Sequence, residues 1–119
     1  MNKILVIDDD HDLSGTIKAV LEYEKYTVFL SHSGEDGILQ AEELEPNLIL
    51  LDIMMPGVHG VEVLRRIKRI HPDIKAIMIT AVDDKDIASE AMAEGAADYV
   101  TKPLDLNYLD ALVTFQVMG

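Results

Sequence analysis

The chain has 119 residues, so we expect residues 1–119 to form a single domain with one buried core. Hydrophobic residues make up 49% of it and the mean hydropathy is +0.13, which favours a compact globule over a disordered chain. Its formal net charge of −12 argues against direct binding of nucleic acid or of an anionic membrane surface. The absence of cysteine excludes disulfides and thiolate ligands and suits a cytoplasmic location. No apolar run approaches the roughly 18 residues of a membrane span, and we expect no signal peptide.

Two kinds of segment alternate along the chain. Five short apolar runs rich in β-branched residues predict strands at residues 3–7, 26–30, 48–51, 76–80 and 98–101. Helical spacing of apolar residues lies between and after them, in the stripes Leu13/Ile17/Val20/Leu21, Ile38/Ala41/Leu44, Val63/Leu64/Ile67/Ile70, Ile87/Ala91/Met92 and Leu106/Leu109/Val113. Five strands alternating with five helices predict a doubly wound α/β domain, in which a five-stranded parallel sheet is covered by helices on both faces.

Polar residues mark the ends of several predicted helices. Ser33 with Asp36 has the spacing of a capping box, Gly95 stands where a helix C-cap belongs, and Asp105 suits the start of the last helix. We interpret the acidic residues Asp10 and Asp12 as capping or solvated side chains.

Charged or hydroxyl side chains end four of the five predicted strands. The first strand ends at Asp8 and Asp9, the third at Asp52, the fourth at Thr80, and the fifth runs into Lys102. The second strand, which ends near residue 31, contributes nothing comparable. Since ligands of such sheets bind beyond the carboxyl ends of the strands, we expect these groups to form one site.

Three carboxylates and one ammonium group would leave excess negative charge in that site. A hard divalent cation with oxygen ligands resolves this, and Mg²⁺ prefers one or two carboxylates together with water and phosphate oxygens. Asp52 ends a buried strand by itself, which suits a carboxylate nucleophile that forms an acyl phosphate. Lys102 and Thr80 could then bind phosphoryl oxygens.

The sequence resembles the receiver domains of bacterial two-component response regulators over essentially its whole length. The stretches that carry the resemblance are "ILVIDDD", "LILLDIMMPGVHGVEVL", "AIMITA" and "EGAADYVTKPLD". A lone pair of aspartates would be weak evidence for this family. Here the acid pair, Asp52, Thr80 and the Lys-Pro pair follow one another in the order typical of the family, each at the end of a predicted strand, and this is strong evidence. The resemblance implies the flavodoxin-like, three-layer receiver fold.

The resemblance also assigns roles to residues. It implies that Asp52 is the phosphoacceptor and that Thr80 and Lys102 bind the phosphoryl group. It implies that Mg²⁺ is held by the side chains of Asp8, Asp9 and Asp52 and by the backbone carbonyl of Met54.

A signalling switch, rather than a metabolic enzyme, is the function that the resemblance implies. The phosphoryl donor would be a sensor histidine kinase, a phosphotransfer protein or a small phosphodonor. Tyr99 matches an aromatic residue whose rotamer follows Thr80 on activation. The signal would emerge on the fourth helix (about residues 84–94), the fifth strand and the fifth helix, toward an output domain or a second copy. The fourth helix is rich in alanine, with Ile87 and Met92 as its large apolar anchors, so we expect it to be loosely packed.

The remaining charged groups are expected to have ordinary roles. We interpret the four histidines as surface residues, with His59 closest in sequence to the nucleophile, and we interpret Arg65, Arg66, Lys68 and Arg69 as a solvated helix face. The Lys102–Pro103 bond is expected to be cis, because X-Pro is where a cis bond is least costly.

Two other classes share parts of the pattern. A phosphatase of the haloacid dehalogenase type also uses an aspartate nucleophile, but on its first strand in a D-x-D-x-T pattern, whereas Leu13 and Ser14 follow the acids here. It would also leave Asp52 unexplained. A flavodoxin-like cofactor binder needs a phosphate loop rich in glycine and hydroxyl groups, and the acidic loop of this chain would repel the phosphate.

Overall fold

The structure is a computed structural model that describes residues 2–80 and 85–118. Within these ranges the strands are β1 (Lys3–Ile7), β2 (Thr27–Ser31), β3 (Leu48–Asp52), β4 (Lys75–Thr80) and β5 (Asp98–Thr101). The helices are α1 (His11–Tyr23), α2 (Gly34–Leu44), α3 (Gly60–Ile70), α4 (Lys85–Ala93) and α5 (Leu106–Met118). The strands form one parallel sheet in the order β2-β1-β3-β4-β5. The predicted doubly wound α/β fold is therefore confirmed.

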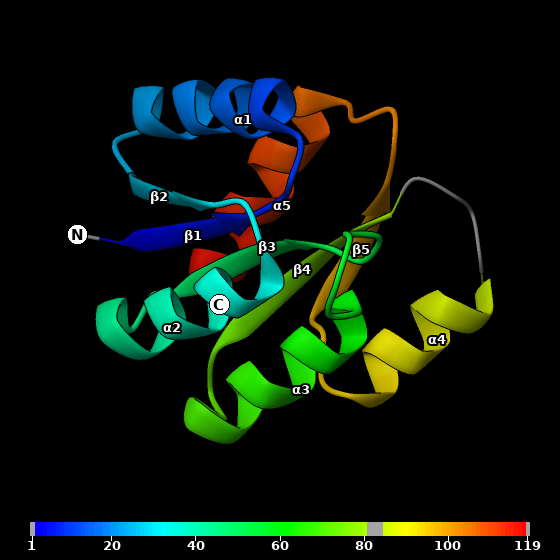
Figure 1. Ribbon diagram of the computed structural model, residues 1–119. Coiled ribbons are helices and arrows are strands. Elements are labelled where there is room, and N and C mark those ends of the chain that lie inside the picture. The colour runs from blue at the N-terminus through cyan, green and yellow to red at the C-terminus, as the bar shows by residue number, and fades with distance from the viewer. Residues whose placement is uncertain (1, 81–84, 119) are drawn as a thin grey trace.

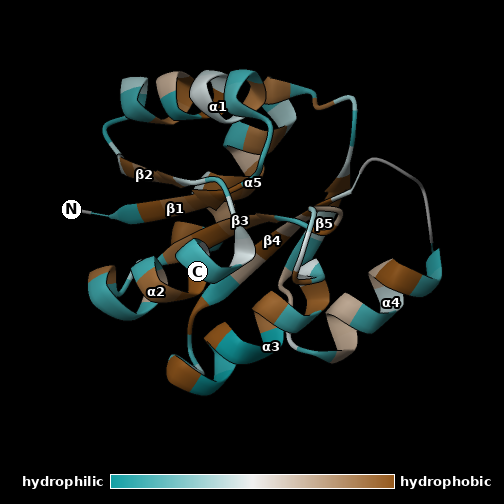
Figure 2. Cartoon of the chain, in the orientation of Figure 1, coloured by the Kyte–Doolittle hydropathy of each residue, from teal (hydrophilic) through white to brown (hydrophobic). Residues whose placement is uncertain are grey.

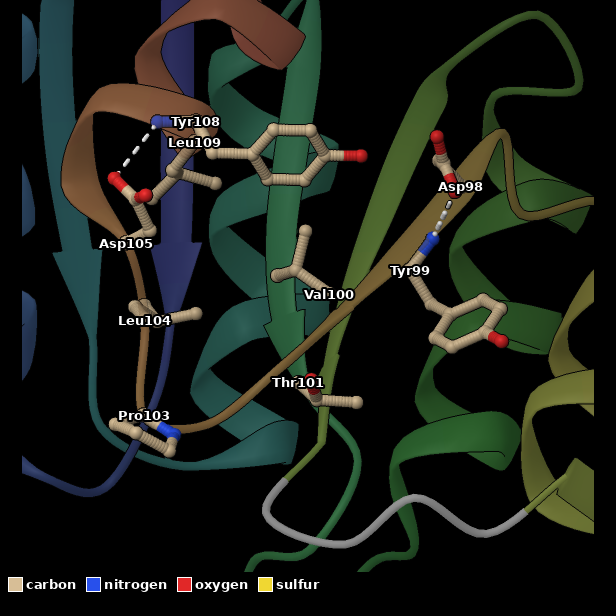
Figure 3. Close-up of a pocket in the computed structure, with 9 residues that line it drawn as sticks. All are labelled: Asp98, Tyr99, Val100, Thr101, Pro103, Leu104, Asp105, Tyr108 and Leu109. Atoms are coloured by element: carbon tan, nitrogen blue, oxygen red, sulfur yellow. Dashed lines mark hydrogen bonds between the residues drawn. The ribbon is translucent and has the colours of Figure 1, made fainter.

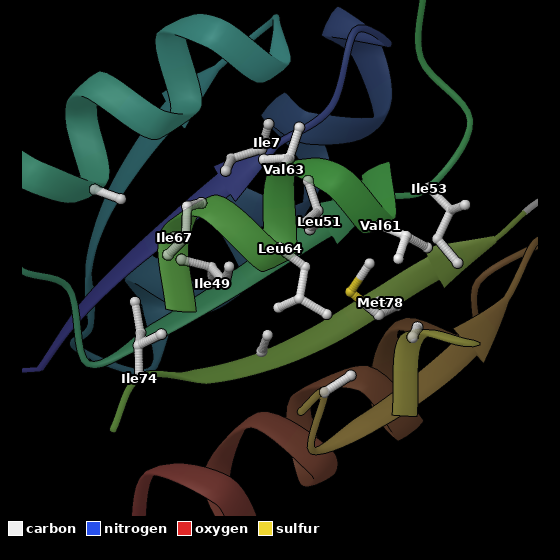
Figure 4. Close-up of a cluster of buried hydrophobic side chains, with 14 of the residues drawn as sticks. Ile7, Ile49, Leu51, Ile53, Val61, Val63, Leu64, Ile67, Ile74 and Met78 are labelled. Atoms are coloured by element: carbon white, nitrogen blue, oxygen red, sulfur yellow. The ribbon is translucent and has the colours of Figure 1, made fainter. Parts of the chain in front are cut away.

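Helices cover both faces of this sheet. Figure 1 shows α1 and α5 on one face and α2, α3 and α4 on the other. Each face has its own apolar core: Ile17, Leu21, Leu109 and Val113 belong to the cluster under α1 and α5. The larger cluster lies under the other three helices, and Figure 4 shows Leu51 and Met78 of the sheet beside Leu64 and Ile67 of α3. Hydrophobic colour accordingly concentrates on the central strands in Figure 2.

The three central strands are buried on both faces. Every residue of β3 is buried, and so is every residue of β1 after Lys3 and of β4 after Lys75. This agrees with the continuous apolar runs in the sequence, because alternating polar residues would be left without water in such a sheet. The rigid centre fixes where each strand ends, and so fixes the position of the groups that follow.

The predicted helix ends are mostly confirmed. Asp10 caps α1 by accepting the Leu13 N–H at 3.0 Å, and Asp105 Oδ1 accepts the Asn107 and Tyr108 N–H groups at the start of α5. Gly95, after α4, has a φ of +101°, which glycine adopts at little cost.

The capping box at the start of α2 is only half formed. Ser33 Oγ accepts the Asp36 N–H at 3.1 Å, as predicted. The Asp36 carboxylate does not return to the cap: its Oδ2 accepts hydrogen bonds from Ser31 Oγ at 2.6 Å and from Gln40 Nε2 at 2.7 Å. These bonds lower the pKa of Asp36 below its ordinary value.

Small residues attach α4 to the sheet, and the prediction that Met92 anchors it is wrong. Ala88 and Ala91 are its buried residues, whereas the Met92 side chain is 42% exposed and Ile87 is half-buried against the core. Part of the expected helix, residues 81–84, lies outside the described residues.

The basic face of α3 was interpreted as solvated, but the structure shows that it also contacts α4. Arg65 forms ion pairs with Glu62 of its own helix and with Glu94, which follows α4, the latter at 3.1 Å. Lys68 donates to the carbonyl of Ile74 at 2.8 Å, and a side chain on Gly95 would meet the Lys68 Cε at 2.8 Å. The carboxyl end of α4 is therefore held against α3.

No helix among the described residues is long and apolar enough to cross a membrane.

Two glycines allow a matched test of this packing. A Cβ on Gly60, the first residue of α3, would lie 2.5 Å from Ile53 Cα and 2.8 Å from the Asp52 carbonyl oxygen, whereas a Cβ on Gly15 in α1 would meet nothing within 4 Å. Gly60→Ala should lower the free energy of unfolding by about 1–3 kcal/mol, because backbone cannot move aside cheaply. Gly15→Ala should raise it by roughly 0.5–1 kcal/mol through the entropy of the unfolded chain. Urea unfolding of both variants measures the difference, and equal effects would contradict the predicted contact.

Candidate functional site

The ends of β1 and β3 place two aspartates side by side. Ile7 is in register with Leu51, so the residues that follow them, Asp8 and Asp52, lie at the same level, and Asp52 is the last residue of β3. Both side chains are buried, with 0% of Asp8 and 2% of Asp52 exposed. In this strand order the chain turns from one side to the other between β1 and β3, which is where ligands bind in such sheets.

Three carboxylates meet at this point. Asp8, Asp9 and Asp52 each offer an oxygen, and the three atoms lie within 4.8 Å of one another. Backbone N–H groups orient the buried pair: Asp10 N–H donates to Asp8 Oδ1 at 2.9 Å and Met54 N–H to Asp52 Oδ1 at 3.0 Å. The other oxygen of Asp8, Oδ2, is buried and has no hydrogen-bond partner among the described residues. A buried carboxylate oxygen left in this way fits a cation ligand, and an all-oxygen set fits Mg²⁺.

Lys102 supplies positive charge to the same point. Its Nζ lies 3.3 Å from Asp52 Oδ2 and 3.9 Å from Asp8 Oδ2. The Lys102–Pro103 bond is cis, as predicted, and the Lys102 N–H donates to the Thr80 carbonyl at 2.7 Å. Partial burial by itself would lower the pKa of Lys102, but the carboxylates of Asp52 and Asp8 outweigh it and raise the pKa above its ordinary value. Lys102 therefore stays protonated in the site.

The proton affinity of Asp8 is raised by its surroundings. Burial is the largest cause, and the nearby Asp52 carboxylate adds to it, while the Asp10 N–H and Lys102 act in the opposite direction. Together they raise the pKa of Asp8 from 3.8 to about 6. The single positive charge of Lys102 therefore does not balance the two buried carboxylates. The remaining negative charge supports the prediction that a cation binds here.

The other predicted residues lie around this group. Thr80 is buried at the end of β4, next to β3. Tyr99, in β5, is half-buried and packs against the core cluster beneath α3 and α4. Met54 follows the site with its side chain 54% exposed, and the use of its carbonyl as a metal ligand stays a prediction.

The end of β2 supports the backbone of the site, although its sequence predicts no comparable contribution from this strand. The Asp8 N–H donates to the Ser31 carbonyl at 2.9 Å, and His32 Nδ1 lies 3.0 Å from the Asp8 carbonyl oxygen. The His32 ring stacks on the ring of His11, with centroids 3.7 Å apart. His32, which was interpreted as a surface residue, is half-buried and supports the backbone of Asp8. No spacing rule links residues 11 and 32, so only the fold could bring them together.

Two other histidines also have structural roles. His59 accepts the Val61 N–H through Nδ1 at 3.2 Å and caps α3, while remaining exposed. His71 is half-buried, and its Nε2 lies 3.0 Å from the Ala41 carbonyl oxygen.

Comparison with known families agrees with this geometry. The model of the response regulator receiver domain family matches residues 4–114, which include all the site residues. This chain belongs to the response regulator receiver domain family.

Curated relatives of this receiver domain include two bacterial regulators. The uncharacterized transcriptional regulatory protein YkoG of Bacillus subtilis is 37% identical over 110 residues, which are 92% of this chain and 48% of YkoG. The response regulator GacA of Pseudomonas protegens is 37% identical over 110 residues, which are 90% of this chain and 51% of GacA. The receiver domain thus spans about half the length of these relatives.

Solved structures share the fold closely. A CheY-like receiver domain protein from Methanospirillum hungatei superposes with a TM-score of 0.96 at 28% identity, over 99% of this chain and 94% of that one. The receiver domain of DrrB, described as BeF3-activated, superposes with a TM-score of 0.91 at 31% identity, over 100% of this chain and 99% of that one. Because the chain belongs to the receiver domain family, we set aside the two alternatives considered from the sequence, a phosphatase of the haloacid dehalogenase type and a flavodoxin-like cofactor binder.

The raised pKa of Asp8 predicts a pH dependence for this receiver domain. The folded chain holds the Asp8 proton more tightly than the unfolded chain, so the free energy of unfolding should lose a contribution on the order of 2 kcal/mol as pH rises from about 4 to about 6. Asp8→Asn should lack this loss and be the more stable protein at pH 7 in the absence of divalent cations. Urea unfolding in EDTA between pH 4 and 7 measures it. Asp12→Asn, at an exposed position of α1, serves as the control, and an Asp8→Asn curve parallel to that of the parent would contradict the prediction.

Proposed function

We propose that this receiver domain is a phosphorylation-dependent switch in which Asp52 accepts a phosphoryl group from the phosphohistidine of a sensor histidine kinase or phosphotransfer protein. The observation that carries the proposal is the meeting of Asp8, Asp9 and Asp52 within 4.8 Å, with Lys102 3.3 Å from Asp52. Family membership supports it, because signalling through such domains depends on this kind of acidic site.

Asp52 has the position that a carboxylate nucleophile needs. Its Oδ1 is held by the Met54 N–H at 3.0 Å, which fixes the plane of the carboxylate at the mouth of the site. An Asp52 oxygen forms a bond to phosphorus while the bond from phosphorus to the donor nitrogen breaks, and the electron pair leaves with the imidazole. Lys102 and Thr80 then contact phosphoryl oxygens, and the ammonium group compensates part of their charge.

Mg²⁺ is the cofactor that we propose for this transfer. Asp8, Asp9 and Asp52, with the backbone carbonyl of Met54, would hold it, and Asp9 is the more direct ligand of the acid pair. The Asp8 Oδ2, which has no hydrogen-bond partner among the described residues, and the all-oxygen donor set fit such a cation. When bound, it offsets the charge of the carboxylates and of the phosphoryl oxygens. The chain would catalyse only its own phosphorylation and dephosphorylation.

The phosphoacceptor can be identified by mass. Incubation with acetyl phosphate or phosphoramidate and Mg²⁺ should add one phosphoryl group, and Asp52→Asn should abolish it, because the amide is not a nucleophile of this kind. Intact-protein mass spectrometry measures the addition. EDTA and Asp9→Ala should each reduce it strongly, whereas Asp12→Asn should match the parent. Equal labelling of Asp52→Asn would place the nucleophile elsewhere.

The output face in this proposal is formed by α4, β5 and α5. Thr80 ends β4, which pairs with β5, and Tyr99 lies in β5 with its ring packed toward α4. A phosphoryl group on Asp52 that draws in the Thr80 side chain would leave space for the Tyr99 ring, and such a side chain is an element that a local charge can bias. The partner on this face would be an output domain or a second copy. YkoG and GacA are each about twice as long as this chain, which leaves room in them for an output domain.

Amide chemical shifts can test this face. Beryllofluoride with Mg²⁺, which imitates the acyl phosphate, should shift amides of α4, β5 and α5 in addition to those around Asp52. Two-dimensional NMR of the labelled chain measures it, and the Tyr99→Ala variant should reduce the shifts in α4. Changes concentrated on α1 would show that the output face is misassigned.

A further inference from the structure

Asp9 differs from the other two acids of the site in how it is held. Asp8 and Asp52 are buried, and each has one carboxylate oxygen bonded to a backbone N–H, whereas Asp9 is exposed. Among the described residues, none forms a hydrogen bond or an ion pair with the Asp9 carboxylate. The direction of the Asp9 side chain therefore depends on the two peptide groups on either side of it.

The peptide that follows Asp9 is fixed by the site and by α1. Its N–H belongs to Asp10 and donates to Asp8 Oδ1 at 2.9 Å. The side chain of Asp10 in turn caps α1, since it accepts the Leu13 N–H at 3.0 Å. Rotation of this peptide would break the first bond and disturb the start of the helix, so the peptide is held from both directions.

The peptide that precedes Asp9 is fixed by His32. Its carbonyl belongs to Asp8, and His32 Nδ1 lies 3.0 Å from the carbonyl oxygen. Because a carbonyl oxygen only accepts, Nδ1 carries the hydrogen of this bond and donates it. The Asp8 N–H donates to the Ser31 carbonyl at 2.9 Å. Both backbone groups of Asp8 are thus tied to the end of β2, and the chain enters Asp9 in one direction.

His32 itself has little freedom to move. The strand β2 ends one residue before it, and Ser33, one residue after it, caps α2. Its ring is half-buried and stacks on the ring of His11, the first residue of α1, with 18° between the ring planes. The stack hinders rotation of the His32 ring and keeps Nδ1 directed at the Asp8 carbonyl, so the contribution of His11 is to orient His32.

We propose that His32, oriented by His11, is a positioning residue that fixes the direction of Asp9 and thereby makes the acidic site selective for Mg²⁺ over Ca²⁺. The inference rests on the Mg²⁺ site proposed above and names what determines its selectivity. Mg²⁺ is the smaller ion and requires nearly ideal octahedral geometry, whereas Ca²⁺ accepts more oxygens in flexible arrangements. A carboxylate that is free to turn still serves Ca²⁺ but no longer provides the geometry that Mg²⁺ requires.

Substitutions of His32 separate its hydrogen bond from its ring. His32→Phe keeps a ring that can stack on His11 but has no donor, and His32→Asn keeps an N–H donor close to the position of Nδ1. His32→Phe should raise the dissociation constant of Mg²⁺ about tenfold, as is typical when a group that orients a metal ligand is removed, and that of Ca²⁺ by less than about threefold. His32→Asn should recover most of the Mg²⁺ affinity, and His11→Ala should give an intermediate loss. Two-dimensional NMR of the labelled, unphosphorylated chain, titrated with MgCl₂ or CaCl₂, measures both constants.

His71 offers a matched control at the opposite end of the sheet. It is half-buried, its Nε2 lies 3.0 Å from the Ala41 carbonyl oxygen, and it stands between α3 and the start of β4. His71→Phe therefore also removes a histidine from a backbone carbonyl, but it should leave both dissociation constants unchanged. Urea unfolding in EDTA compares the stability of the two Phe variants, so a general loss of stability is measured separately from the loss of selectivity.

A second control concerns other acids that could attract cations. Figure 3 shows Asp98 and Asp105 lining a pocket between β5 and α5, where Asp98 Oδ1 accepts the Tyr99 N–H at 2.8 Å and Asp105 Oδ1 accepts the Tyr108 N–H at 3.2 Å. Asp98→Asn combined with Asp105→Asn removes both charges while asparagine keeps the accepting oxygens. This variant should bind Mg²⁺ and Ca²⁺ as the parent does. A loss of Mg²⁺ affinity as large as that of His32→Phe would place the cation in this pocket and overturn the inference.

A measurement without metal separates this inference from the proposed function. The Asp9 N–H belongs to the peptide whose carbonyl His32 binds. In EDTA the Asp9 amide signal should therefore shift or broaden in His32→Phe, while in His32→Asn it should stay close to that of the parent. Absence of Mg²⁺ binding to the parent would refute the cofactor proposed above. An unchanged Asp9 amide in His32→Phe, with Mg²⁺ binding retained by the parent, would refute only the role of His32.

Three further results would overturn the inference. An unchanged ratio of the two dissociation constants in His32→Phe would show that His32 does not select between the ions. A loss in His32→Asn equal to that in His32→Phe would show that the hydrogen bond is not the cause. An equal loss in His71→Phe would mean that removing any partly buried histidine weakens the site.

Discussion

The arrangement of this domain depends on the placing of two buried carboxylates at the ends of neighbouring parallel strands. Asp8 and Asp52 are brought together by the pairing of β1 with β3, and their strands are too deeply buried to move apart. Their repulsion is reduced by backbone N–H groups and by Lys102, but not removed, as the raised pKa of Asp8 shows. Such strain is acceptable where a cation and a phosphoryl group are to be bound, because binding then relieves it.

Each neighbouring element contributes to holding this pair. The end of β2 supports the Asp8 backbone through Ser31 and His32, and Lys102 reaches Asp52 from the segment that follows β5. His32 and Lys102, which follow the two edge strands, therefore both reach the aspartates at the ends of the central strands. The output face proposed above lies across β4 from Asp52, and Lys102 of the acidic site directly follows β5, so β5 connects the site with that face.

The sequence predicted the regular elements of this structure and the polar residues that end the strands. Continuous apolar runs located the buried strands to within about a residue, and the polar groups that end them located Asp8, Asp52 and Thr80. Apart from the groups at the ends of the strands, contacts between distant segments could not be foreseen, because they depend on register and side-chain reach. The stacking of His11 on His32 and the ion pair of Arg65 with Glu94 are of this kind. The burial of Ala88 in place of Met92 depended on the rotation of α4 about its axis, which an alanine-rich sequence leaves open.

The contact between α3 and α4 has a mechanical consequence. Arg65 and Lys68 hold the carboxyl end of α4, so that end acts as a fulcrum for the nine-residue helix. At 1.5 Å per residue the helix is about 13 Å long, and a tilt of roughly 5° about this end would displace the other end by about 1 Å. The amino end lies on the side of the molecule where the strands end and the aspartates meet (Figure 1). A displacement of the amino end would therefore move most of the helix while its carboxyl end stayed against α3.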